Sequence, residues 1–266
     1  MESLGVTNVG VLGGSGKMGR LVCQAVAEEP GLELVAAVDP SEGGRTLHEA
    51  TGVTGSEITV AAEPKALVDA DAEVAVDFTR PDAVMDNIRF CVENGVHAVV
   101  GTTGIGPEGL DQIRGWLGES PEVGVIVAPN FSIGAVVGQR LAEEAARFFP
   151  AAEVIELHHD RKVDAPSGTA TATARRIAAA RREEWSGPAG GEEYRGGDVD
   201  GVRVHSVRLP GLVAHQEVIF GAQGQTLTIR HDAPDRSCYM PGVLLAIKHV
   251  AQRPGLTVGL EPLLGL

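Results

Sequence analysis

The sequence predicts an α/β protein in which an N-terminal doubly wound parallel sheet is followed by a smaller α+β domain with an open mixed sheet. Two observations carry this prediction. Short apolar runs alternate with helical periodicity over the first 130 residues, which is typical of parallel strands covered by helices on both faces. From residue 131 the alternation gives way to a long helix and a cluster of strand candidates, which indicates a second, separate sheet.

The first domain is expected to alternate regularly, apart from a weakly patterned stretch between its second and third strands. Apolar runs predict strands at 9–12, 32–38, 74–77, 96–100 and 123–127. Amphipathic periodicity predicts helices at 18–28, 82–93 and 108–117. A doubly wound sheet of this kind binds its ligands at the carboxyl ends of its strands.

The second domain is expected to pack two helices against several strands. The pattern predicts helices at 133–149 and from 167 to about 182, a glycine-rich surface loop at 184–201, and strands at 153–158, 202–209, 214–220 and 225–231. A last helix at 239–251 and an apolar tail at 256–260 are expected to return to the first domain. We therefore expect a first domain of residues 1–130 joined by 240–266, and a second domain of residues 131–239.

Composition limits the classes of protein to consider. The 266 residues are 43% apolar and 22% charged, which fits a folded globular chain. No apolar stretch is long enough to span a bilayer and no signal-peptide pattern is present, while three scattered cysteines indicate reduced thiols and a cytoplasmic location. A formal net charge of −14 disfavours nucleic-acid and membrane partners, so an anionic ligand requires a local concentration of positive charge.

A glycine-rich turn follows the first strand and opens the first helix. Gly13–Gly19 fits G-x-G-x-x-G from Gly14, and Asp39 ends the second strand at the distance expected of a ribose-binding acid. This context predicts a Rossmann-type dinucleotide-binding domain whose backbone N–H groups hold the pyrophosphate. Asp39 favours NADH, whereas Lys17, with Arg45, can offset the 2′-phosphate of NADPH, so we expect use of NADH, NADPH or both. The residues expected around the pyrophosphate are Gly13, Gly14, Ser15, Gly16, Lys17 and Met18.

Three later strand ends are expected to complete the cofactor site. Phe78 follows the third strand and is placed to wall the nicotinamide ring, although a core position explains it equally well. Each group is also compatible with an ordinary turn, and their shared edge of the sheet is the argument for a site. Residues expected to meet ribose or carboxamide are Gly101, Thr102 and Thr103 after the fourth strand, and Ala128, Pro129, Asn130 and Phe131 after the fifth.

The segment Glu156–Ala170 places proton donors directly before a helix start. It contains His158, His159 and Lys162, and Ser167 has the position of an N-cap. Exposed N–H groups and the helix dipole favour an anion at such a start. A capped helix after a solvated polar loop is the alternative, but two adjacent histidines followed by a lysine have no evident packing purpose. The segment therefore predicts chemistry on a small carboxylate.

This segment resembles the active-site signature of the dihydrodipicolinate reductase family, whose members are also called 4-hydroxy-tetrahydrodipicolinate reductases. The family pattern Glu-x-His-His-x-x-Lys-x-Asp-Ala-Pro-Ser-Gly-Thr-Ala is present at every fixed position. A motif of this length and composition is far more specific than a glycine fingerprint. The likeness spans nearly the whole chain, and its other matching segments are Gly13–Gly19, Asp77–Thr79, Gly101–Thr103, Ala128–Phe131 and Pro241–Val243.

The resemblance implies an NAD(P)H-dependent reductase of lysine and diaminopimelate biosynthesis, whose cyclic dicarboxylate substrate loses water and is reduced to tetrahydrodipicolinate. It assigns His158 as the proton donor, Lys162 as a second donor and His159 as a substrate contact. Gly168 and Thr169 are implied to hold a substrate carboxylate at the helix start. A homotetramer built through the sheet of the second domain is also implied.

One departure from the family lies between His159 and Lys162. Asp160 and Arg161 occupy the two variable positions, where many members have a third histidine before the lysine. The acid beside His159 can alter its protonation, whereas Arg161 keeps the cationic character.

Three other functions are compatible with parts of the sequence. Another Rossmann-type oxidoreductase acting on a small carboxylate would share the first domain but not the complete 158–170 segment. A non-catalytic NAD(P)-binding sensor would lose the proton donors, which are intact. A metal site at His158 and His159 is not expected, because adjacent side chains on a strand point to opposite faces and no matching ligand spacing follows.

Overall fold

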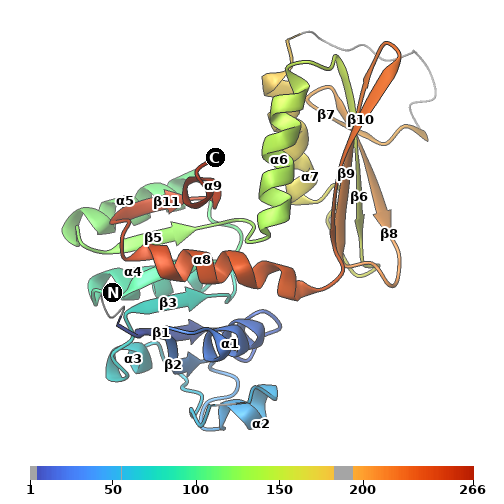
Figure 1. The fold of residues 1–266 in the computed structure, drawn as a ribbon. Helices are drawn as coiled ribbons and strands as arrows, with labels where there is room; N and C mark the ends of the chain where they lie inside the picture. Colours follow the sequence, from blue (N-terminus) through green and yellow to red (C-terminus); the bar gives the residue numbers. More distant parts are fainter. Residues whose placement is uncertain (1–4, 55, 183–193) are drawn as a thin grey trace. The chain divides into compact units, whose positions relative to one another are not determined.

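In the computed structural model, which describes residues 5–54, 56–182 and 194–266, the chain forms two units around separate sheets (Figure 1). The first unit comprises the chain up to Phe131 together with Tyr239–Leu266, and the second comprises Ser132–Cys238. The predicted fold class is confirmed, because the first unit holds a parallel sheet and the second a mixed one.

The sheet of the first unit is parallel throughout, in the order β11-β5-β4-β3-β1-β2. Its strands are β1 (Thr7–Leu12), β2 (Leu32–Val38), β3 (Val74–Asp77), β4 (His97–Val100), β5 (Gly124–Val127) and β11 (Gly255–Val258). The expected bounds of β2 and β3 are correct, and those of β1, β4 and β5 differ by one or two residues at one end. β11 pairs with β5 and forms one edge of the sheet.

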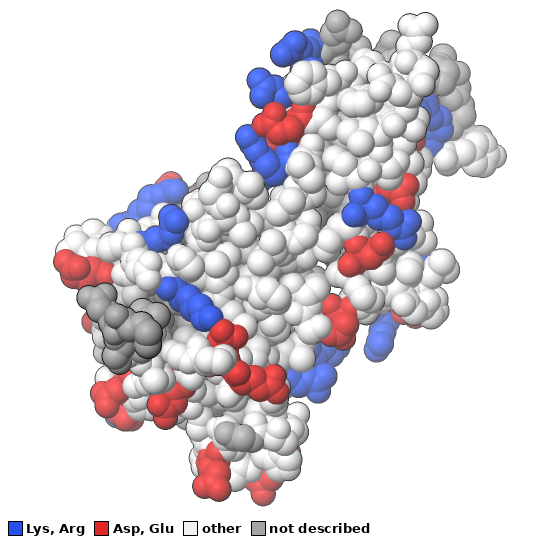
Figure 2. Space-filling view, viewed as in Figure 1, with Lys and Arg blue, Asp and Glu red and all other residues white. Residues whose placement is uncertain are grey.

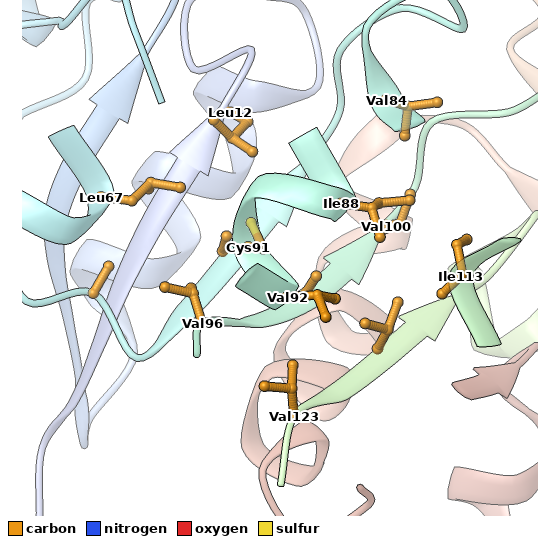
Figure 3. Packing of buried hydrophobic residues seen from close by; sticks show 14 of the residues in the cluster. Leu12, Leu67, Val84, Ile88, Cys91, Val92, Val96, Val100, Ile113 and Val123 are labelled. Atoms are coloured by element: carbon orange, nitrogen blue, oxygen red, sulfur yellow. The ribbon is translucent and has the colours of Figure 1, made fainter. Parts of the chain in front are cut away.

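Helices cover both faces of this sheet, as a doubly wound fold requires. On one face lie α1 (Gly19–Glu28) and α8 (Met240–Val250), which contact each other, and on the other lie α4 (Val84–Glu93) and α5 (Pro107–Glu119). Figure 3 shows the core on the α4–α5 face, where alternate strand residues such as Val100 meet Ile88 and Ile113. This alternation places every second strand side chain in each core.

Short helices occupy regions where the sequence shows no clear periodicity. α2 (Leu47–Thr51) and α3 (Lys65–Asp69) lie in the weakly patterned stretch after β2, and α9 (Glu261–Leu264) lies near the end of the chain. A capping box starts α2, in which Thr46 and Glu49 exchange side-chain and backbone hydrogen bonds. Helices of four or five residues complete little more than one turn, so amphipathic periodicity cannot reveal them.

The second unit contains a five-stranded sheet in the order β10-β9-β6-β8-β7, with α6 and α7 packed on it. The central pair β6–β8 is parallel and the other pairs are antiparallel. The elements are α6 (Ile133–Ala146), β6 (Ala151–His158), α7 (Gly168–Ala180), β7 (Gly197–Val199), β8 (Val202–Arg208), β9 (Ala214–Ala222) and β10 (Gln225–Ala233).

The loop expected at 184–201 is wrong in its last part. Gly197–Val199 forms β7, which pairs antiparallel with β8, while residues 184–193 lie outside the described residues. A three-residue strand with one apolar side chain carries no alternation from which it could be predicted.

A buried carboxylate organises the carboxyl ends of β3 and β4. Asp77 is 2% exposed, and its Oδ1 accepts hydrogen bonds from the Thr79 N–H at 2.9 Å, the Thr79 hydroxyl at 2.7 Å and the Thr102 hydroxyl at 2.6 Å. Its Oδ2 accepts from the Asn87 amide of α4 at 2.8 Å. The carboxylate thus ties the turn after β3 to the turn after β4.

We expect Asp77→Ala to destabilise the protein markedly. The substitution leaves the buried donors of Thr102 and Asn87 without this acceptor, and each such loss costs about 1–3 kcal/mol. The half-buried Thr79 loses the same acceptor. Urea unfolding should therefore show a clearly lower midpoint than wild type. Asp69→Ala is the matched control, because that carboxylate forms an exposed ion pair with Lys65 and its loss should change the midpoint little. Equal midpoints for the two variants would contradict the role given to Asp77.

Candidate active site

The polar and glycine-rich turns of the first unit gather at one edge of its sheet. Because all six strands are parallel, the turns that follow β1, β2, β3, β4 and β5 share that edge. The strand order reverses beside β1, since the chain passes from β1 to β2 on one side and later to β3 on the other. Such a switch point is where open α/β sheets bind ligands.

The turn after β1 packs so tightly that two of its positions require glycine. Gly13 has a φ of +77°, which is a left-handed backbone conformation that residues with a side chain rarely adopt. A Cβ on Gly19 would lie 1.9 Å from the Gly13 carbonyl oxygen. The start of α1 therefore lies directly against the end of β1.

This turn fits the pyrophosphate of a dinucleotide. The hydroxyl oxygen of Ser15 is buried and has no hydrogen-bond partner. The backbone N–H groups of Ser15, Lys17 and Met18 likewise donate to no acceptor within the described chain. A buried hydroxyl without a partner is rare in folded proteins, and backbone N–H groups at the start of a helix suit a phosphate group.

Asp39 follows β2, and its carboxylate is held by hydrogen bonds from Ser41. The guanidinium of Arg45, the other cation expected near a 2′-phosphate, is already paired. Oδ1 of Asp39 accepts hydrogen bonds from the Ser41 N–H at 3.1 Å and from its hydroxyl at 2.7 Å. Arg45 forms an ion pair with Glu42 at 2.5 Å and donates to the Glu49 carbonyl at 2.6 Å. Lys17 is exposed and forms no ion pair within the described residues.

The turn after β3 carries Phe78, whose ring packs against the turns that follow β4 and β5. The Phe78 ring covers Gly101 so closely that a Cβ there would lie 2.2 Å from Cε1 of the ring. The centroids of Phe78 and the buried Phe131 are 5.8 Å apart. Phe78 is thus packed as a wall at the strand ends, where an aromatic ring can flank a flat nicotinamide.

The remaining cofactor candidates differ in what their side chains can reach. The Thr102 hydroxyl is buried and donates to Asp77, so only its backbone is offered to a ligand, whereas Thr103 is exposed. Ala128 is buried, Pro129 is exposed and Asn130 is partly exposed. The residues of this edge fit a nicotinamide dinucleotide.

In the second unit, the candidate proton donor lies beside a fully buried carboxylate. Glu156 is 0% exposed, and its Oε2 lies 2.5 Å from Nδ1 of His158. Arg208 donates one hydrogen bond of 2.8 Å to each oxygen of the same carboxylate. The Ser167 N–H donates to Oε1 at 3.1 Å. One carboxylate therefore joins the end of β6, the end of β8 and the start of α7.

Two opposing effects set the ionisation of Glu156. Burial by itself raises the pKa of this carboxyl group, but hydrogen bonds from His158, Arg208 and Ser206 outweigh burial and lower the pKa to about 2. Glu156 is therefore ionised at neutral pH, and each of its oxygens acts only as an acceptor.

The loop between β6 and α7 carries the other candidates. Nζ of Lys162 lies 2.8 Å from each carboxylate oxygen of Asp164. The pKa of His159 is lowered by burial first and then by positive charge on Arg236, Arg161 and His158. Asp160 acts in the opposite direction but does not reverse the shift. The structure thus adds Arg236 to the cationic surroundings of His159.

The start of α7 has the expected cap. The Ser167 hydroxyl accepts a hydrogen bond of 3.1 Å from the Ala170 N–H. Gly168 is exposed and Thr169 is partly exposed, and both lie in the first turn of α7. This leaves a surface at which a carboxylate can accept backbone hydrogen bonds.

Figure 2 shows the charged side chains on one face of the molecule. Lys and Arg side chains are scattered there among Asp and Glu, in a chain of net charge −14. Among the described residues, no group of three or more His, Cys, Asp or Glu could hold a metal ion. No described helix is both long enough and apolar enough to cross a membrane.

Sequence reasoning gave no role to three residues that shape these sites. Glu156 belongs to the family motif, and its position two residues before His158 on a strand places both side chains on one face. Asp77 ends an apolar strand, where an acid is conspicuous. Arg208 is 52 residues from Glu156 in sequence, and no local pattern could pair them.

The comparisons with known proteins cover nearly the whole chain. The family profile described as "Dihydrodipicolinate reductase, N-terminus" matches residues 7–131, and that described as "Dihydrodipicolinate reductase, C-terminus" matches residues 134–264. The 4-hydroxy-tetrahydrodipicolinate reductase of Nocardia farcinica is 55% identical over 264 residues, covering 97% of this chain and 98% of the relative. Its namesake from Mycobacterium sp. (strain KMS) is 52% identical over 263 residues, covering 97% and 99%.

Solved structures agree with these relatives. The dipicolinate-bound dihydrodipicolinate reductase from Paenisporosarcina sp. TG-14 superposes with a TM-score of 0.85 at 40% identity, covering 97% of this chain and 99% of that one. An apo scyllo-inositol dehydrogenase from Lactobacillus casei, at 11% identity and a TM-score of 0.65, covering 98% and 93%, shares the fold alone. The chain belongs to the dihydrodipicolinate reductase family.

Proposed function

We propose that this protein catalyses the NAD(P)H-dependent reduction of 4-hydroxy-tetrahydrodipicolinate to tetrahydrodipicolinate, with loss of water, in lysine and diaminopimelate biosynthesis. The observation that carries the proposal is the Glu156–Thr169 arrangement, in which a histidine, an arginine and a capped helix start lie around one buried carboxylate. Lys162 lies in the loop that joins them, paired with Asp164. This protein contains the arrangement, and over 97% of its length it is 55% identical to a 4-hydroxy-tetrahydrodipicolinate reductase. Relatives of this family act on a small dicarboxylate, which matches the cationic loop and the helix start.

The first unit would bind the reduced dinucleotide. Gly13–Met18 would hold the pyrophosphate on backbone N–H groups, and the Ser15 hydroxyl would gain the partner it lacks. Asp39 would accept hydrogen bonds from the adenosine ribose. Phe78 would flank the nicotinamide, with contacts from Gly101, Thr102, Thr103, Ala128, Pro129, Asn130 and Phe131. When bound, the reduced nicotinamide supplies a hydride to an electron-poor carbon of the substrate.

The second unit would hold the substrate and deliver the proton. The N–H groups of Gly168 and Thr169 would bind one carboxylate, and His159 would contact the substrate. His158 would donate a proton from the ring nitrogen that does not face Glu156, and Lys162 would act as a second donor or as a point charge beside a carboxylate. The ring hydroxyl would leave as water together with a hydrogen from the adjacent ring carbon, which forms a double bond. The hydride and the proton from His158 would then add to the unsaturated ring and complete the reduction.

The proposal is tested by following the absorbance of reduced nicotinamide with substrate formed in situ from pyruvate and aspartate semialdehyde by the preceding synthase. We expect rapid oxidation of NADH or NADPH that depends on the synthase. Absence of oxidation with either cofactor, by protein that still binds NADH, would contradict the assigned substrate.

We expect His158→Ala and Lys162→Ala each to lower kcat by about 10²–10⁴-fold, because general acids contribute rate factors of that size. The same assay measures the effect. His205→Ala is the matched control, since His205 lies on β8 in an ion pair with Glu153, away from the proposed donors. Near-normal turnover in both test variants would remove the assigned proton donors.

We expect Asp39→Ala to weaken NADH binding more than NADPH binding. The carboxylate accepts hydrogen bonds from the free ribose hydroxyls of NADH but repels the 2′-phosphate of NADPH. Its removal therefore takes hydrogen bonds from NADH and a repulsion from NADPH. Fluorescence titration of each cofactor gives the two affinities. If both affinities fall by the same factor, another residue reads the ribose.

The proposal includes a cytoplasmic homotetramer assembled through the sheet of the second unit. The helices α6 and α7 pack against this sheet, yet Leu227 on β10 remains 38% exposed. Edge strands with exposed apolar residues are surfaces on which further chains pair or pack. Light scattering coupled to size exclusion should give the mass of four chains, and a monomeric mass at working concentration would contradict this part of the proposal.

A further inference from the structure

The structure places a second pair of residues behind the proposed proton donor. We propose that Glu156 is a positioning residue that fixes the ring orientation and tautomer of His158, and that Arg208 holds Glu156 in that role. This inference rests on the proposed function, because it assumes that His158 gives a proton to the substrate. Neither Glu156 nor Arg208 is assigned contact with substrate or cofactor.

Strand register brings the three side chains together. β6 and β8 are parallel, with His158 opposite Arg208 and Glu156 opposite Ser206. Residues two apart on a strand point to the same face, so Glu156 and His158 lie on one side of the sheet together with Arg208. Their common face is the one against which Ser167 begins α7, since its N–H bonds to Glu156.

The hydrogen bond to Glu156 determines which nitrogen of His158 carries the proton in the neutral ring. An ionised carboxylate only accepts, so Nδ1 must donate to it. Nε2 is then the nitrogen left to exchange a proton with a ligand. When the ring is protonated, Nε2–H is the donor, and after transfer the ring returns to the Nδ1–H form without rotating.

Arg208 explains why a charged acid is tolerated at a fully buried position. Its guanidinium donates to both oxygens of Glu156 at 2.8 Å, and buried charges persist where they are paired in this bidentate way. The same guanidinium donates to the carbonyl of Asp164 at 2.7 Å. It thereby links the carboxylate that orients His158 to the loop that carries Lys162.

Glutamine at position 156 would reverse the hydrogen bond to His158. Arg208 donates to both oxygens of Glu156, while the Ser167 N–H donates to Oε1 and His158 faces Oε2. The Ser167 N–H can only donate, whereas a neutral imidazole can also accept, so the amide oxygen of Glu156→Gln should occupy the Oε1 side. The amide nitrogen would then face Nδ1 of His158 and donate to it, which favours the Nε2–H tautomer. In a well-studied catalytic triad, the corresponding loss of the orienting acid lowers kcat by about 10⁴-fold.

A similar cluster on the other face of the sheet provides a matched control. Glu153 bonds to His205 at 2.8 Å and to Arg195, so it also joins a carboxylate, an imidazole and a guanidinium. It lies three residues before Glu156 on β6, which places it on the opposite face. Glu153→Gln should leave kcat within about twofold of wild type, with its assembly checked by size exclusion.

The first test uses the wild-type protein and requires no variant to fold. Nitrogen-15 NMR of the histidine rings, with the His158 signal assigned by its loss in His158→Gln, reports the tautomer directly. We expect neutral His158 to be protonated at Nδ1. A neutral His158 protonated at Nε2 would overturn the proposal whatever the activity.

The second test compares kcat and KM in Glu156→Gln. We expect kcat to fall by about 10²–10⁴-fold while KM for the substrate stays within about threefold and His158 changes to the Nε2–H tautomer. Unchanged kcat with an unchanged tautomer would overturn the role of Glu156. Wild-type protein that lacks reductase activity but shows the Nδ1–H tautomer would instead contradict the proposed function and leave the geometry of the pair intact.

Discussion

The ion pair between Glu156 and Arg208 is the interaction on which the second unit depends. It lies where β6, β8 and α7 meet, and the carboxylate is 0% exposed. Removing one partner from such a pair leaves an uncompensated buried charge, which is far more costly than never burying the pair. The sheet end, the helix start and the loop between them are therefore fixed together, and the side chains proposed for chemistry are attached to that fixed point.

The first unit also contains a buried carboxylate, but no cation is paired with it among the described residues. Asp77 is also buried at a strand end, but its partners are two threonine hydroxyls, a backbone N–H and the Asn87 amide. Neutral donors hold the carboxylate without adding positive charge to the edge where a pyrophosphate is proposed to bind. The two sites thus use a buried acid for rigidity, while only the second adds an arginine beside the group proposed to transfer a proton.

The sequence predicts those features of the structure that depend on neighbouring residues, and misses those that depend on residues far apart in the chain or on very short elements. The bounds of β2 and β3 are predicted to the residue, because each apolar run, broken only by Glu33 in β2, is bounded by polar or turn residues. The short elements α2, α3 and β7 were missed, since each is too short to show a period. The motif around His158 was visible in the sequence, but its pairing with Arg208 depends on the register of β6 and β8, which local patterns do not encode. The sequence predicts that Thr102 meets the cofactor through its hydroxyl or its backbone carbonyl, and only the fold shows that the hydroxyl donates to Asp77 instead.

The Lys162–Asp164 ion pair before α7 differs from the buried Glu156–Arg208 pair, because its lysine can change partners. The pKa of Asp164 is lowered, first by its hydrogen bond from Lys162, so the acid is ionised and occupies the lysine in the absence of an anion. Yet the Asp164 side chain is 60% exposed, and exposed pairs of this kind contribute about 1 kcal/mol or less. A substrate carboxylate held at Gly168 could therefore replace Asp164 beside Lys162 at little cost. The Glu156–Arg208 pair cannot exchange in this way, because the Glu156 carboxylate is fully buried. The difference in burial separates the charges that hold the site together from those that remain available to a ligand.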